Sequence, residues 1–218
     1  MNELNKLSRR ERILMCTYEA TIKISFVYPI IISILEIFML IYTIGNTELY
    51  GEYLWRYRCF YILLLAAAII FIAINLYVKK DIGHRFGIMN ISNPLFAAFS
   101  FGWALAVTYS DVSITGEVDP VLFMTFSLTV PLSIFLLPYM YAAIVAVSDI
   151  LLLYTIISHT QVSAALINLI VFFIFQFFLG ITFLKLRLRL SERVVEEQDN
   201  ASIDSMTGLM NRRSYLRE

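Results

Sequence analysis

The stretch VLFMTFSLTVPLSIFLLPYMYAAIVAVSDILLLYTII, residues 121–157, decides how the chain is folded. It carries a single charged residue, Asp149. As one helix it would be about 55 Å long, nearly twice the hydrocarbon core of a bilayer, which is about 30 Å thick. Pro138 has no N–H with which to continue a helix. The stretch is therefore predicted to form two membrane-spanning helices with a tight turn at Pro138.

Other apolar segments are also long enough to cross the hydrocarbon core, which takes about 20 helical residues. The six predicted spans cover residues 22–44, 59–78, 93–110, 121–137, 139–157 and 164–184. Two of them begin near a polar residue followed by proline, Asn93-Pro94 and Asp119-Pro120, a pattern typical of a capped first helical turn. The predicted fold class is all-α, a polytopic membrane protein with six transmembrane helices.

Composition and charge agree with this class. Of 218 residues, 59% are hydrophobic and 16% are charged, whereas soluble domains carry about 25% charged residues. The net charge is zero, so no basic surface favours a nucleic-acid partner. Cys16 and Cys59 are far apart and form no motif that would bind a metal.

The basic residues are segregated along the chain. In the six-span arrangement only Arg56 and Arg58 lie on one side of the membrane. On the other side lie Lys6, Arg9, Arg10, Arg12, Lys23, Lys79, Lys80, Arg85, Lys185, Arg187, Arg189 and Arg193. By the positive-inside rule, both termini are predicted to be cytoplasmic.

Three polar residues are predicted to lie near the middle of the membrane: Glu36, Asp149 and Gln176. Counting the helical rise from the cytoplasmic end of each span puts Glu36 roughly 20 Å and Asp149 roughly 15 Å deep, with Gln176 at a similar level. A charge at that depth costs several kcal/mol, and no Lys or Arg lies at the same depth to pair with it. These three are the candidate signal-sensing residues, for a cation, a small polar ligand or a proton. The alternative is that they only hydrogen-bond between helices, which contributes about 1 kcal/mol or less per bond.

Residues 185–203, KLRLRLSERVVEEQDNASI, follow the last span. Charged and apolar residues alternate here. Leu184, Leu188 and Val195 fit one seam of a heptad pattern, but Ser191 and Gln198 fall on the same seam. The segment is predicted to continue the sixth span as a cytoplasmic signalling helix, with a short parallel coiled coil left open as an alternative.

The segment DSMTGLMNRR, residues 204–213, resembles the D-x-L-T-G-L-x-N-R-R signature that opens the GGDEF domain of bacterial diguanylate cyclases. Met206 replaces leucine, a volume-conserving apolar exchange. The resemblance implies that these residues form the structural entry to the domain, so no catalytic role is expected for them. The matching positions are Asp204, Thr207, Gly208, Leu209, Asn211, Arg212 and Arg213.

The resemblance also implies an output activity beyond these residues. Diguanylate cyclases condense two GTP molecules into cyclic di-GMP with Mg²⁺, and their catalytic residues lie downstream on a Gly-Gly-Asp/Glu-Glu-Phe hairpin. No Gly-Gly pair occurs in this sequence. No catalytic residue, metal ligand or cofactor is therefore assigned to it, and GTP and Mg²⁺ are expected for the missing domain.

The predicted organisation has four parts: a cytoplasmic N-terminal segment (1–21), a six-span sensory domain (22–184), a signalling helix (185–203) and the start of a GGDEF domain (204–218). The expected function is a homodimeric input domain of the bacterial inner membrane. It would sense an unknown small molecule, ion or membrane signal and regulate a diguanylate cyclase. Two alternatives stay open: control of a degenerate GGDEF domain with an attached phosphodiesterase, and a small membrane transporter whose tail motif is accidental.

Overall fold

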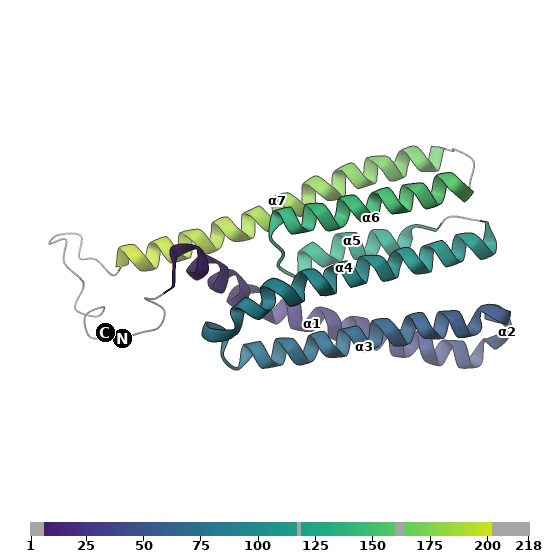
Figure 1. Cartoon of the computed structure of the whole chain (residues 1–218), viewed down its shortest axis with the longest axis horizontal. Coiled ribbons are helices and arrows are strands. Elements are labelled where there is room, and N and C mark those ends of the chain that lie inside the picture. Colours follow the sequence, from purple (N-terminus) through teal and green to yellow (C-terminus); the bar gives the residue numbers. More distant parts are fainter. Residues whose placement is uncertain (1–6, 117–118, 160–163, 202–218) are drawn as a thin grey trace.

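The computed structural model describes residues 7–116, 119–159 and 164–201, and every regular element within these ranges is helical. The long helices lie side by side in an elongated bundle, with α1 and α3 at one side, α6 and α7 at the other, and α4 and α5 between them (Figure 1). Helix α1 begins and α7 ends at the same end of the bundle. The elements are α1 (Arg9–Gly45), α2 (Thr47–Tyr50), the 3-10 turn η2 (Gly51–Tyr53), α3 (Leu54–Lys79), α4 (Ile82–Thr115), α5 (Val121–Ser133), α6 (Pro138–His159) and α7 (Ala164–Ala201).

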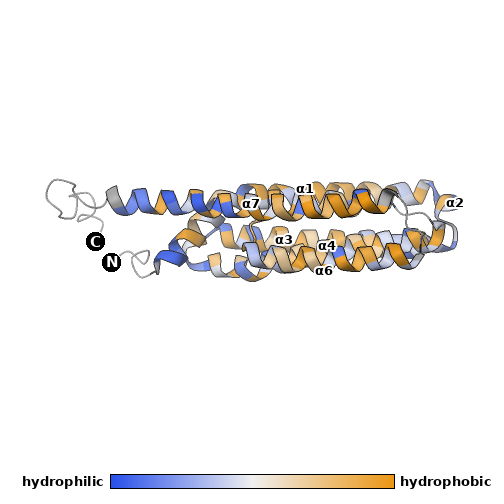
Figure 2. Ribbon diagram, turned by 90° about the horizontal axis from the view of Figure 1, so that it is seen from above, coloured by the Kyte–Doolittle hydropathy of each residue, from blue (hydrophilic) through white to orange (hydrophobic). Residues whose placement is uncertain are grey.

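Five helical segments of the described chain are long and apolar enough to cross a membrane. They are Arg9–Gly45, Thr47–Lys79, Ile82–Thr115, Pro138–Ser158 and Leu166–Asp199. Apolar residues cover the outside of the bundle, whereas hydrophilic ones gather at the start of α1 and along the last turns of α7 (Figure 2). By the length and composition of its helices, the chain is a multi-pass membrane protein.

The fourth predicted span is not a full-length helix. Helix α5 has only 13 residues, about 20 Å at the usual helical rise. The chain then leaves the helix over residues 134–137 and enters α6 at Pro138. The predicted turn was therefore misplaced. Pro138 does not end the first helix but opens the second, where its missing N–H costs nothing.

The predicted helix start at Asn93-Pro94 was wrong. Helix α4 begins at Ile82, after Asp81, whose side chain accepts a hydrogen bond from the backbone N–H of His84. Pro94 lies inside α4, as membrane helices allow where neighbouring groups satisfy the freed backbone.

Asp119-Pro120 lies close to its predicted place. Pro120 is the N-cap residue of α5, one position before the predicted one. The carboxylate of Asp119 accepts a hydrogen bond from the Val121 N–H at 3.0 Å. Asp119 is nevertheless not the N-cap residue as predicted, because Pro120 takes that place without a side-chain cap bond.

Helices α1 and α7 cross at the polar end of the bundle. Arg12 of α1 makes a two-point ion pair with Asp199 of α7, with Nη2 and Oδ2 3.1 Å apart. Cys16 of α1 is in hydrogen-bonding reach of Ser191 of α7, and Val195, one turn further on, is buried. The seam predicted for a coiled coil thus packs on α1 of the same chain. We call residues 185–201 of α7 the stalk.

Candidate functional site

The strongest candidate site is a polar pair between α6 and α7. The side-chain amide of Gln176 donates a hydrogen bond to Oδ1 of Asp149 at 2.8 Å, and both side chains are buried. Each lies on the inward stripe of its helix, because apolar residues at helical intervals of three, four, seven or eight positions are buried on the same face. On α6 these are Val145, Leu152 and Ile156; on α7 they are Leu169, Phe173 and Leu184.

Tyr141 closes one side of this pair. It lies two turns before Asp149 on α6, is fully buried, and donates a hydrogen bond to the backbone carbonyl of Gln176 at 3.3 Å. Gly180, one turn beyond Gln176, makes room for the Tyr141 ring, since a Cβ at Gly180 would overlap it. The absence of a side chain on α7 therefore lets an aromatic ring from α6 fix the spacing of the two helices.

The pair has unused hydrogen-bonding capacity. Oε1 of Gln176 is buried and has no hydrogen-bond partner in the described chain. It is an acceptor, and it belongs to the same amide that binds the Asp149 carboxylate. The arrangement can therefore take up a donor, whether a proton on the carboxylate, an ammonium group or another small cation. Within the described residues, no group of three or more His, Cys, Asp or Glu side chains could hold a metal ion.

The structure does not bring Glu36 to this pair. Glu36 is buried on α1, which packs against α3, and it lies near enough to Tyr61 of α3 to act on it electrostatically. Its Oε2 atom has no hydrogen-bond partner among the described residues. The equal depth of the two acids did not make a common pocket, because depth along a helix does not fix which neighbour a side chain faces.

A second polar cluster surrounds the break between α5 and α6, and the sequence did not reveal it. Residues 134–137 are not helical, although the Ile134 N–H still donates to Val130 O and Leu137 O accepts from the Tyr141 N–H. Ile134 and Phe135 are fully buried. Buried backbone carbonyls need donors, above all in a membrane. Three come from three other helices: Arg187 of α7 donates to Leu132 O, Ser25 of α1 to Ser133 O at 3.0 Å, and Asn93 of α4 to Phe135 O at 2.8 Å.

Helix α7 thus connects both clusters to the polar end. Gln176 lies in the polar pair, Arg187 binds the end of α5, and Ser191 meets α1. The Arg187 guanidinium also stacks over the Phe183 ring, 4.4 Å from its centre. In the sequence, Arg187 is one of several basic residues that follow the last span. Only the fold shows that it donates a hydrogen bond to the last turn of α5.

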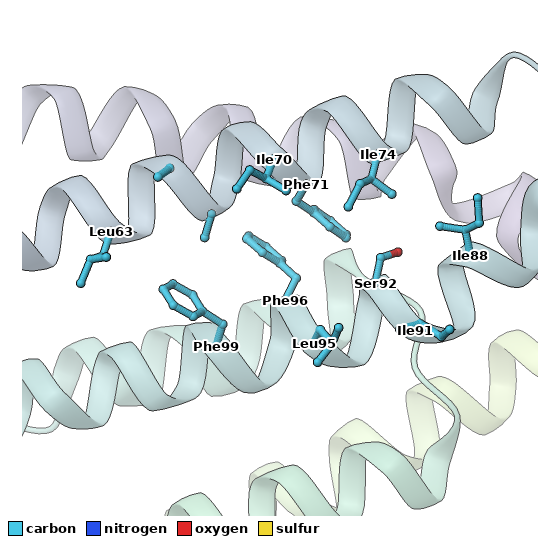
Figure 3. A pocket seen from close by; sticks show the side chains of 12 residues that line it. Leu63, Ile70, Phe71, Ile74, Ile88, Ile91, Ser92, Leu95, Phe96 and Phe99 are labelled. Carbon is cyan, nitrogen blue, oxygen red and sulfur yellow. The ribbon is translucent and has the colours of Figure 1, made fainter.

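A groove of about 680 Å³ lies between α3 and α4 (Figure 3). Its walls are apolar except for Ser92, and the stacked rings of Phe71 and Phe96, 4.2 Å apart, line it. Ile91 and Leu95 on its rim are exposed. Without charged groups to orient a polar ligand, this groove has the composition of a lipid-facing surface.

The residues that carry the GGDEF signature lie outside the described residues. They are Asp204, Thr207, Gly208, Leu209, Asn211, Arg212 and Arg213. No family model, curated protein or solved structure matches the chain. The resemblance therefore stays a prediction from residues 204–213, and the site rests on the geometry of α6 and α7.

Proposed function

We propose that this chain is the signal-input part of a membrane protein that regulates a C-terminal diguanylate cyclase, which makes cyclic di-GMP from GTP. The observation that carries the proposal is the DSMTGLMNRR motif at residues 204–213. In this arrangement α7 ends at Ala201, three positions before Asp204, with its polar end in the cytoplasm of a bacterial cell.

The proposed input site is the Asp149–Gln176 pair. A proton, cation or small polar ligand bound there would change the hydrogen bond between α6 and α7. Because α7 is one helix from Ala164 to Ala201, a shift at Gln176 would reach the stalk. Glu36 is proposed as a second, separate sensing position on the α1–α3 side of the bundle.

The proposed output needs two copies of the chain. One side of the stalk is covered by α1, whereas Leu186, Leu190 and Val194 recur every four residues and are exposed, Leu190 to 53%. Apolar residues in a row along a charged helix are typical of a helix–helix interface. The proposed homodimer therefore pairs the two stalks through this face, and a shift of α7 would change how the two cyclase domains meet.

The test uses the full-length protein in membranes, supplied with GTP and Mg²⁺, with cyclic di-GMP as the product measured. We expect product from the wild type and an altered rate in D149N and E36Q. The T108V variant serves as the control, because Thr108 is a buried polar residue of α4 outside the proposed site. GTP binding without product would favour a degenerate domain. The absence of both GTP binding and product would overturn the proposal.

One observation favours a transporter as the second candidate. Discontinuous helices with buried backbone, like the break at residues 134–137, are typical of transporter binding sites. A transporter would move protons or a small cation across reconstituted vesicles and would lose this flux in D149N. A sensor would show no flux in the wild type or in D149N.

A further inference from the structure

A pocket of about 580 Å³ opens at the polar end of the bundle, where α1, α6 and the stalk of α7 meet. It differs from the α3–α4 groove because charged and apolar side chains share its wall. The side chains that matter for its chemistry are Arg9 and Arg10 of α1, Pro138 and Tyr139 of α6, and Leu188 and Glu192 of α7.

The charged part of the wall is mainly positive. Arg10 has no ion pair with any residue that the structure describes. Arg9 lies 3.9 Å from Glu192, but the two side chains are 59% and 52% exposed, and an exposed pair at that distance contributes little. The 22-residue helix α6 also begins at this pocket, with Pro138 as its first residue, and adds the positive end of its dipole.

The rest of the wall is apolar. Leu14 and Leu137 line the pocket together with Leu188, and so does Tyr139, whose exposed side chain lies on the first turn of α6. A free inorganic anion would gain nothing from these side chains. A molecule with an anionic head and an apolar body would use both parts of the wall.

We propose that this pocket binds the phosphate headgroup of an anionic phospholipid. Arg9 and Arg10 hold the phosphate, and the glycerol and first acyl carbons lie against Leu137 and Tyr139. The phosphate competes with Glu192 for Arg9, so binding loosens one of the contacts that tie α1 to the stalk. Lipid composition would then act on α7 whether or not a cyclase domain follows it.

The test is native mass spectrometry of the purified chain, in detergent, with equal amounts of phosphatidylglycerol and phosphatidylcholine. The wild type is expected to retain phosphatidylglycerol preferentially. R9Q/R10Q should lower that preference roughly 30-fold, at about 1 kcal/mol per basic residue. The matched control is K79Q/K80Q, which removes two exposed charges at the same end of the bundle. E192Q is expected to raise the retention of phosphatidylglycerol, because the lipid phosphate no longer competes with the Glu192 carboxylate for Arg9.

The gain in E192Q distinguishes the proposal from a folding defect, since a misfolded variant would not bind better. Equal preference in R9Q/R10Q and the wild type would overturn the proposal. An equal loss in K79Q/K80Q would also overturn it, because any surface charge would then suffice. Displacement of the lipid by soluble glycerol 1-phosphate at equal concentration would identify a site for a free anion and contradict the lipid assignment.

Discussion

The ring of Tyr141 on α6 occupies the space that a side chain on Gly180 of α7 would need. The Tyr141 hydroxyl also donates to the carbonyl of Gln176, one turn before Gly180. Small residues let membrane helices approach closely, and hydrogen bonds then hold them. This contact sets the distance between α6 and α7 next to the Asp149–Gln176 pair, so the geometry of the pair depends on a glycine that bears no polar group.

Replacing Gly180 with alanine should therefore destabilise the protein. The new methyl group would overlap a fully buried ring that cannot turn away, and overpacking of this kind costs about 1–3 kcal/mol. The measurement is thermal unfolding in detergent. Gly102 in α4 is the matched control, because a Cβ there meets no atom within 4 Å, and G102A should be neutral or slightly stabilising. Equal melting temperatures for G180A and G102A would contradict the contact.

The Asp149–Gln176 hydrogen bond should appear as a coupling in a double-mutant cycle. We expect D149L and Q176L together to cost less than the sum of the two single changes, with a coupling of about 0.6–1.7 kcal/mol, the usual range between membrane helices. Unfolding free energies of the four proteins give this value. A control cycle pairs D149L with T108V, whose side chains lie on α6 and α4, and should be additive. Additivity in both cycles would mean that the pair does not form.

The sequence located the five long apolar helices, because each span needs about 20 apolar residues in a row. The fourth predicted span corresponds only to the short helix α5. The sequence failed at the breaks. Asn93-Pro94 has the composition of a helix start, but Asn93 instead lies inside α4 and donates to the carbonyl of Phe135. Asparagine can cap a helix or donate a hydrogen bond to a buried carbonyl, and only the neighbouring backbone distinguishes the two roles.

The candidate site was only half predictable for a related reason. Depth along the helices placed Asp149 and Gln176 at one level, and they do meet. The same arithmetic placed Glu36 there, yet α1 turns it towards α3. Helix order in the bundle, which no local pattern records, decides which polar residues share a site. The same limit hid Arg187, whose partner is a carbonyl 55 residues away in the chain.

Replacing Arg187 with methionine should loosen the break between α5 and α6. The carbonyl of Leu132 would lose its donor. Because Leu132 is exposed, we expect only the net value of one hydrogen bond, about 0.5–1.5 kcal/mol. Limited proteolysis and thermal unfolding would report the change. Arg189, two positions on, is exposed, so R189M removes the same charge without touching the break. Similar proteolysis of the two variants would show that Arg187 does not cap α5.

The two faces of the stalk should give two different disulfides. Ser191 faces Cys16 of α1 within the chain, so S191C in a C59S background should oxidise to an internal bridge. Leu190 points away from the bundle and is exposed. L190C, in a chain without Cys16 and Cys59, should therefore link two chains in membranes. Non-reducing gels distinguish the products, because only the second doubles the apparent mass.

S191C tests the contact between α1 and the stalk, and L190C tests the pairing of two stalks, so either result can be negative without the other. A covalent dimer from S191C without an internal bridge would mean that α1 leaves the stalk in membranes, and the seam at Ser191 would then be free for a coiled coil. No dimer from L190C would remove the proposed pairing face while leaving the α1–stalk contact intact. If S191C formed the internal bridge and L190C formed the dimer, each stalk would lie between α1 of its own chain and the stalk of its partner. A displacement of α7 would then have to change both contacts, and the α1 contact includes the closer Arg12–Asp199 ion pair as well as Arg9–Glu192.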